Sequence, residues 1–161
     1  MHAIRPLEAF DRDWVLDRHV AQYCDGEGFD ASFPPLVALR LDEVLVATDP
    51  GQACGWILWR DGVRQGSILH GRDPDGAARL RLFYLDPGAR GQGLGLALLD
   101  RLTVHAATHG ARTLRVATHA EHAAAGRLYA RAGFRRTARI PVTSFGRALT
   151  EEHWEKAIPG A

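Results

Sequence analysis

The sequence contains almost no lysine, very little cysteine and no long apolar run, and each shortage narrows what the protein can be. Lys156 is the only lysine among 20 basic residues, and the formal net charge is +1. This near balance of charge gives no reason to expect nucleic acid or an anionic membrane surface as a partner. No apolar stretch is long enough to span a bilayer, and residues 1–14 contain no apolar signal core. We therefore expect a cytoplasmic protein.

The two thiols, Cys24 and Cys54, lie far apart and lack the spacing of a metal site. Their scarcity indicates a reducing compartment and no disulfide scaffold. The eight histidines show no zinc-protease spacing, so no metal is expected. A length of 161 residues, without repeats or linkers, predicts one domain over residues 1–161 with a substantial core.

Hydrophobic periodicity and turn residues predict an alternation of strands and helices. Asp61-Gly62, between two apolar runs, is a strong hairpin signal. The expected strands are 3–7, 54–60, 63–70, 79–85 and 113–119, with two more around Gly146 in 135–158; the expected helices are 8–24, 34–46, 93–109 and 121–132. This order predicts a mixed α/β or α+β sheet with helices on both faces.

The most informative stretch is the glycine-rich turn 90–95, between an apolar strand and an amphipathic helix. A helix N-terminus carries free N–H groups and partial positive charge, and glycines let a ligand approach them. The turn is therefore a candidate phosphate cradle. It lacks the lysine of a P-loop, and neither glycine register fits the dinucleotide-binding fingerprint. A glycine-rich turn without a ligand is the ordinary alternative.

Two motifs carry a resemblance to a known family. Arg90, Gly93 and Gly95 satisfy Arg-x-x-Gly-x-Gly, which resembles the acyl-coenzyme A pyrophosphate loop of the GNAT N-acetyltransferases. Residues 128–134, Leu-Tyr-Ala-Arg-Ala-Gly-Phe, resemble the Leu-Tyr-x-x-x-Gly-Phe ending of a later helix in that family. Tyr129 alone could simply pack in the core. The two motifs in the right order make that reading less favoured, and the order of elements is similar to the whole GNAT fold.

The resemblance implies a mostly antiparallel central sheet of about six or seven strands, splayed between strands 79–85 and 113–119, with helices on both faces. It also implies acetyl-CoA as co-substrate, with its pantetheine arm lying in the splay like an added strand. His122 occupies the position at which family members often have an asparagine that contacts pantetheine. The implied cofactor-binding residues are Phe83, Tyr84, Leu85, Arg90, Gly91, Gln92, Gly93, Leu94, Gly95, His122 and Tyr129.

Three segments resemble a narrower group, the GNAT domains fused behind MarR-type winged-helix regulators. They are RDWVLDRHVAQYCDGEGFD (12–30), LRLFYLDP (80–87) and SFGRALTEEHW (144–154). No winged-helix segment precedes them in this sequence, so we expect a standalone catalytic domain without direct DNA binding. The sequence is compatible with a homodimer and does not determine the oligomeric state.

The resemblance places Tyr129 near the cofactor sulfur, where a phenol with a pKa of about 10 can protonate a departing thiolate. An acceptor amine must lose a proton. Many family members use a central-strand glutamate for this, but the corresponding position here falls near Arg79, which cannot act as a base. The remaining candidates for the base are His19, Glu27, Asp30 and His119, each of which could instead be packed or solvated.

Residues 19–30 are expected to form one wall of the amine pocket, and the candidate acceptor-binding residues are His19, Tyr23, Glu27, Asp30, Arg81 and His119. Strand alternation predicts Arg79, Arg81, Phe83 and Leu85 on one face, with Leu80, Leu82 and Tyr84 on the other. An arginine inside a sheet needs a carboxylate partner. We expect a carboxylate of the protein to pair with Arg81; the alternative is a substrate carboxylate, which would imply an amino acid or a similar acceptor.

The sequence thus predicts an acetyl-CoA-dependent N-acetyltransferase that acts on a primary amine of a small molecule or peptide by direct attack in a ternary complex. Transfer of a longer acyl group is one alternative. An acyl-CoA-binding sensor with little turnover is the other, favoured by the missing strand glutamate.

Overall fold

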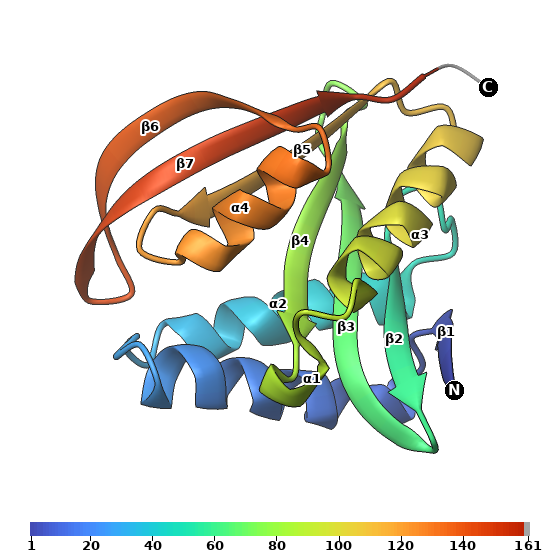
Figure 1. Ribbon diagram of the computed structural model, residues 1–161, viewed down its shortest axis with the longest axis horizontal. Helices are drawn as coiled ribbons and strands as arrows, with labels where there is room; N and C mark the ends of the chain where they lie inside the picture. The colour runs from blue at the N-terminus through green and yellow to red at the C-terminus, as the bar shows by residue number, and fades with distance from the viewer. Residues whose placement is uncertain (160–161) are drawn as a thin grey trace.

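The computed structural model describes residues 1–159 as one seven-stranded mixed sheet flanked by helices (Figure 1). The strand order is β1-β2-β3-β4-β5-β7-β6, and only the β4–β5 pair is parallel. The predicted fold class is confirmed. The strands are β1 His2–Pro6, β2 Cys54–Arg60, β3 Val63–Arg72, β4 Ala78–Leu85, β5 Thr113–His119, β6 Arg135–Ser144 and β7 Arg147–Ala157; the α-helices are α1 Arg12–His19, α2 Phe33–Val46, α3 Leu94–Thr108 and α4 Ala123–Arg131.

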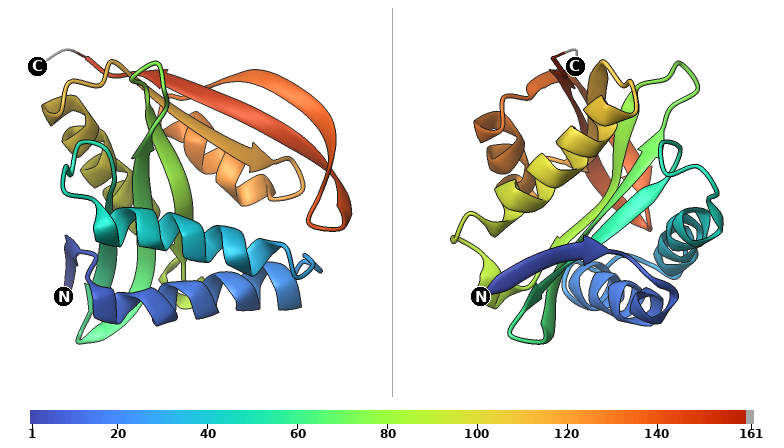
Figure 2. Two further views of the ribbon diagram at one scale, coloured as in Figure 1. Left: turned by 180° about the vertical axis from the view of Figure 1, so that it is seen from behind. Right: turned by 90° about the vertical axis from the view of Figure 1, so that its right-hand side faces the viewer.

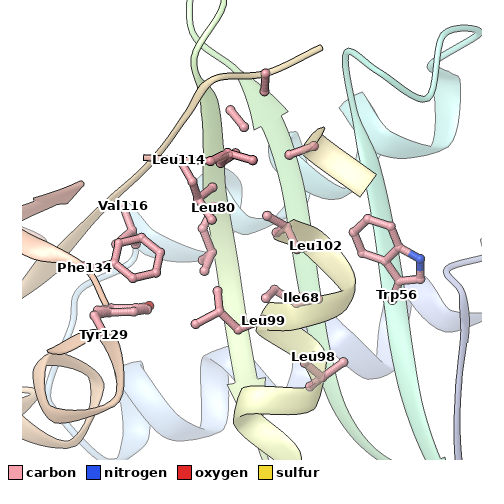
Figure 3. Close-up of a cluster of buried hydrophobic side chains, with 14 of the residues drawn as sticks. Trp56, Ile68, Leu80, Leu98, Leu99, Leu102, Leu114, Val116, Tyr129 and Phe134 are labelled. Carbon is pink, nitrogen blue, oxygen red and sulfur yellow. The ribbon is translucent and has the colours of Figure 1, made fainter. Parts of the chain in front are cut away.

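The sheet separates two apolar cores, because α1 and α2 cover one face while α3 and α4 cover the other (Figure 2). On the α3 side, leucines of α3 pack against Ile68 and Leu80 of the sheet (Figure 3). On the opposite face, Val37 and Leu41 of α2 pack with Ile57 and Leu69. Each helix therefore buries one apolar stripe against the sheet. None of the helices within residues 1–159 has the length and hydropathy needed to cross a membrane.

The helix predicted over residues 8–24 is divided. A 3₁₀ turn, Ala9–Asp11, precedes α1, and a π-helical segment, Val20–Asp25, follows it. In that wider turn the Gly26 N–H donates to the carbonyl of Ala21, at 3.1 Å. Single π-helical turns occur frequently at functional sites. Helical spacing alone could not reveal this change in winding.

Strands β4 and β5 pair only at one end, and this determines where a ligand can enter the sheet. Their register contains two pairs, Ala78 with Leu114 and Arg79 with Arg115. Beyond Arg79 the two strands diverge (Figure 1). The expected splay between these strands is therefore present.

A β-bulge in β4 accompanies the divergence. Leu69 of β3 pairs with Leu82 and His70 pairs with Leu80, so Arg81 is an extra residue on β4. The bulge makes the predicted alternation wrong, because Leu80 packs with Phe83 in the α3 and α4 core while Leu82 packs in the other core.

An ion-pair cluster holds the closed end of the splay. Asp73, in the turn between β3 and β4, accepts two hydrogen bonds from Arg79, at 2.7 and 2.9 Å, and one from Arg115, at 3.2 Å. The hydrogen bond from Arg79 is the largest cause of a lowered pKa for the Asp73 carboxyl. Since Arg79 and Arg115 form the last β4–β5 pair, Asp73 stabilises the strands where they begin to separate.

We expect Asp73→Asn to lower the free energy of unfolding at pH 7 by about 1.5–3 kcal/mol, the usual contribution of hydrogen bonds to charged groups. Because folding lowers the pKa of Asp73, its contribution is complete above the unfolded pKa of about 3.9 and is lost as pH falls through the folded value. Urea unfolding at pH 7 and at acid pH measures both effects. Asp75→Asn is the control, since its side chain is 58% exposed against 13% for Asp73. Equal stability of parent and Asp73→Asn at pH 7 would refute this role.

Candidate active site

A cavity of about 700 Å³ lies in the gap between β4 and β5. Residues from elements on both faces of the sheet line it, so the cavity reaches from the α1 and α2 side to the α3 and α4 side. The lining comes from the splayed parts of β4 and β5, the loop before α3, helix α4, and the residues His19, Gln22, Tyr23, Phe29, Phe33, Leu36 and Phe145.

The glycine-rich loop opens directly onto this cavity. Gly93 immediately precedes α3 with φ 78°, and Gly91 has φ 75°. Both values lie in the left-handed region that favours glycine. A Cβ atom at either position would meet no heavy atom within 4 Å, so the loop surface is open. An open loop at the N-terminus of a long helix can bind an anion through its N–H groups.

Arg90 ties this loop to the π-helical turn across the cavity. Its guanidinium donates to the carbonyl of Leu85 and to Oε1 of Gln22, both at 3.0 Å. Gln22 was not among the predicted site residues. It lies inside the resembling segment 12–30, but no pattern within that segment distinguishes it from its neighbours.

Tyr129 of α4 lines the cavity from the α4 side and is 3% exposed. Its ring packs against Phe134, with ring centroids 5.4 Å apart (Figure 3). Burial raises the pKa of the Tyr129 phenol far above its ordinary value. The phenol is therefore protonated at neutral pH and is able to donate a proton.

Glu27 and His122 lie side by side at the wall formed by the π-helical turn. Oε2 of Glu27 is 3.5 Å from Nδ1 of His122, and the His122 ring lines the cavity. Burial lowers the pKa of His122, and the neighbouring Glu27 opposes that shift. The Tyr23 ring lies 5.8 Å from the His122 ring, and burial together with Glu27 raises the pKa of Tyr23 to about 12.

His19 also lines the cavity but is 1% exposed. Its Nδ1 lies 2.8 Å from the carbonyl oxygen of Val15, so a neutral ring donates there. Burial lowers the pKa of His19 to about 4. The ring is consequently neutral at pH 7 and is a weaker base than an exposed histidine.

Of the two remaining candidates for the general base, one lines the cavity and the other does not. His119, at the end of β5, lines the cavity with its ring 6.1 Å from that of Phe29. The Asp30 carboxylate instead accepts hydrogen bonds from the backbone N–H and hydroxyl of Ser32, which lower its pKa, and it lies outside the cavity lining.

Some of the predicted cofactor-binding residues line the cavity and others do not. Tyr84 points to the α1 side, where its hydroxyl donates to Asp86 at 2.7 Å, and Leu94 is buried in the core. Neither of these side chains, nor that of Gln92, lines the cavity. Those that do are Phe83, Leu85, Arg90, Gly91, Gly93, Gly95, His122 and Tyr129.

Arg81, the extra residue of the β4 bulge, lines the cavity without a carboxylate partner among residues 1–159. The expected pairing with a carboxylate of the protein is wrong. Asp73 binds the neighbouring Arg79 and Arg115 instead. Strand alternation could not anticipate this, because Arg81 is the extra residue of the bulge, where the regular alternation of side chains along β4 is interrupted.

An aromatic wall also lines the cavity, and no sequence pattern predicts it. Phe29, Phe33 and Phe145 meet with ring centroids 4.9–5.2 Å apart, and all three line the cavity. Phe145 comes from the tip of the β6–β7 hairpin, far from the other two in sequence. The segment 144–154 that contains it carries a family resemblance, but no local pattern predicts a contact over that separation.

The chain belongs to the acetyltransferase (GNAT) family, which it matches over residues 13–134. An uncharacterized N-acetyltransferase of Mycobacterium tuberculosis is 26% identical over 121 residues, which is 75% of this chain and 70% of that protein. The structure is similar to a GNAT-family acetyltransferase from Desulfovibrio desulfuricans, with a TM-score of 0.82, 20% identity, and coverage of 99% of this chain and 100% of that one. An acetyltransferase from Salmonella typhimurium, solved with its cofactor acetyl-CoA, has a TM-score of 0.75 and 21% identity, covering 100% of this chain and 96% of the other.

Proposed function

We propose that this protein transfers an acetyl group from acetyl-CoA to a primary amine of a small molecule or peptide, by direct attack in a ternary complex. One observation carries the proposal. The cavity between β4 and β5 reaches both faces of the sheet and is lined by an open helix N-terminal loop, by Tyr129, and by a wall opposite them from the α1 side. Such a cavity allows two ligands to meet from opposite faces. The Salmonella typhimurium structure, solved with acetyl-CoA, supports the choice of cofactor.

The residues present fit this cofactor. The loop 90–95 offers N–H groups and an open surface for a pyrophosphate. On its β5 side the β4 backbone has no strand partner after Arg79, so its polar groups can bind an extended amide-containing arm. Acetyl-CoA supplies a thioester, and transfer forms a carbon–nitrogen bond to the amine while the carbon–sulfur bond breaks.

Tyr129 is proposed as the proton donor to the leaving thiolate. Burial keeps its phenol protonated, and its place in the cavity lining makes the hydroxyl available to a bound ligand. Placing the general acid on the α4 side leaves the α1 side for the acceptor.

The pair of Glu27 and His122 is proposed as the general base, with His122 as the group that accepts the proton. The His122 ring lies in the cavity lining, whereas Glu27 reaches the cavity through its contact with that ring. A neutral His122 can accept a proton from the incoming ammonium, and Glu27 stabilises the imidazolium that forms. His19 is less suited because burial lowers its pKa to about 4.

A second candidate function is an acyl-CoA-binding sensor with little turnover. The observation that favours it is that no carboxylate lines the cavity within residues 1–159. An assay of CoA release from acetyl-CoA over a panel of primary amines separates the two. Amine-dependent release, with the acetylated product identified by mass spectrometry, is expected; tight acetyl-CoA binding without release for any amine would favour the sensor. Longer acyl-CoA donors in the same assay test acyl length.

We expect Gly93→Val to weaken acetyl-CoA binding at least about tenfold, because valine disfavours the positive φ and its side chain fills the open loop surface. Calorimetric titration measures the dissociation constant. Gly88→Val is the matched control, since Gly88 lies just before this loop in the same β4–α3 connection, is equally open and does not have a positive φ. If Gly93→Val binds acetyl-CoA as tightly as the parent, the loop does not hold the pyrophosphate.

Tyr129→Phe should reduce kcat by roughly a hundredfold while leaving acetyl-CoA affinity nearly unchanged, because only the proton donor is removed. Steady-state kinetics and calorimetry give the two quantities. Unchanged kcat under conditions where chemistry limits the rate would show that another donor protonates the thiolate.

Glu27→Gln should change the pH dependence of kcat/KM. An unprotonated His122 is required, so kcat/KM rises with pH through the pKa of His122. Because Glu27 raises that pKa, its loss should move the acid limb to lower pH and reduce the plateau by roughly tenfold. Asp30→Asn, whose carboxylate lies outside the cavity lining, should keep the parental profile. An unchanged profile in Glu27→Gln, with the acid limb lost in His19→Ala, would instead identify His19 as the base.

A further inference from the structure

Arg81 is a cation in the cavity lining that has no direct ion-pair partner among residues 1–159. Its Nε atom is buried and has no hydrogen-bond partner among residues 1–159, and the side chain forms no ion pair with any carboxylate of that range. The two arginines near it are different, because Arg79 pairs with Asp73 at 2.7 Å and Arg40 pairs with Glu43 at 3.0 Å. Arg81 is therefore the member of this local group that has no direct ion pair within residues 1–159.

The surroundings of Arg81 make its unpaired charge less favourable. Burial is the largest cause of a lowered pKa for Arg81, followed by repulsion from Arg40 and Arg79, while Asp73 and Glu43 oppose the shift. A guanidinium nevertheless stays charged at neutral pH. A partly buried charge without a partner is unfavourable, and an anion in the cavity would relieve it.

The β4 bulge and the neighbouring Gly71 determine the position of the Arg81 side chain. The β4 bulge makes it an extra residue on the strand, and its side chain lies over Gly71 of β3. A Cβ atom at position 71 would stand 2.6 Å from Nε of Arg81, too close for any side chain to be accommodated without movement. The absence of a side chain at Gly71 thus allows this placement of the guanidinium.

Arg81 lies on the acceptor side of the cavity. The other lining arginines, Arg90, Arg127 and Arg131, belong to the loop and helix on the α3 and α4 side. Arg81 instead lies close enough to Arg40 and Glu43 of α2 for both to affect its pKa. An anion bound by Arg81 therefore belongs to the acceptor rather than to the phosphates of the cofactor.

We propose that Arg81 binds a carboxylate of the acceptor, so that the acceptor is an amino acid or a related amino carboxylate. A guanidinium binds a carboxylate through two parallel N–H donors, which fixes orientation as well as charge. The apolar wall of Phe29, Phe33 and Leu36 on the same side of the cavity suits an amino acid with an apolar side chain. This inference rests on the proposed function and specifies its substrate class.

The test compares matched amines that differ only at the carboxylate: leucine, methionine and phenylalanine, their amides, and the corresponding decarboxylated amines. The parent should use the amino acids with a kcat/KM at least about tenfold above the other two forms. Arg81→Gln should lower kcat/KM for the amino acids by about 10- to 100-fold, with little change for the amides and an unchanged acetyl-CoA dissociation constant.

Two further variants distinguish carboxylate binding by Arg81 from the loss of a positive charge nearby. Arg40→Gln removes the same charge near Arg81 from a residue outside the cavity lining and should keep the preference for the carboxylate. Gly71→Ala keeps the guanidinium but displaces it, and should reduce the preference in the same direction as Arg81→Gln. Thermal unfolding of each variant confirms that it is folded.

The inference is overturned if the parent uses amides as well as amino acids, or if Arg81→Gln keeps the parental preference. If no amine is acetylated although acetyl-CoA binds, the proposed function fails and the inference is tested by binding. Calorimetric titration of the same amino acids into the CoA-bound parent and Arg81→Gln should then show binding to the parent alone. Binding to neither protein, or equally to both, would refute a carboxylate site at Arg81.

Discussion

The early end of pairing between β4 and β5 is the constraint on which the rest of the site depends. Two parallel strands that pair along their whole length would close the sheet and leave no cavity. Here pairing stops at Arg79 and Arg115, and Asp73 binds both arginines at that point. The ion pairs hold the closed end of the splay, while the β4 bulge redirects the open end. The ion-pair cluster at Asp73 and the cavity therefore both depend on one short stretch of β4, which contains the last pair with β5 and the bulge that follows it.

The two faces of the sheet then supply different chemistry to the same cavity. The α3 and α4 side offers an open loop at a helix N-terminus and a phenol kept protonated by burial. The α1 and α2 side offers aromatic rings, the Glu27–His122 contact and the unpaired Arg81. This division suits a reaction in which an anionic cofactor and an amine approach from opposite faces and meet between the strands.

The sequence predicted the order of elements and the loop at α3, because periodicity, Asp61-Gly62 and the glycine motif are local signals. It could not predict features that depend on contacts distant in sequence. The bulge at Arg81 is set by its register with β3, and the π-helical turn that presents Gln22 and Tyr23 follows a stretch of ordinary helical spacing. Phe145 reaches the cavity only because a hairpin brings it beside Phe29. The roles predicted for Tyr129, Glu27 and the loop glycines stay predictions.

A crystal structure of the protein with acetyl-CoA would show whether the gap between β4 and β5 holds the cofactor. We expect the cofactor sulfur in this gap, within hydrogen-bonding distance of the Tyr129 hydroxyl. We also expect the pyrophosphate at the loop 90–95 and the acetyl group facing the α1 side. A cofactor bound outside this gap, or strands that pair beyond Arg79 and close it, would contradict the proposed role of the gap.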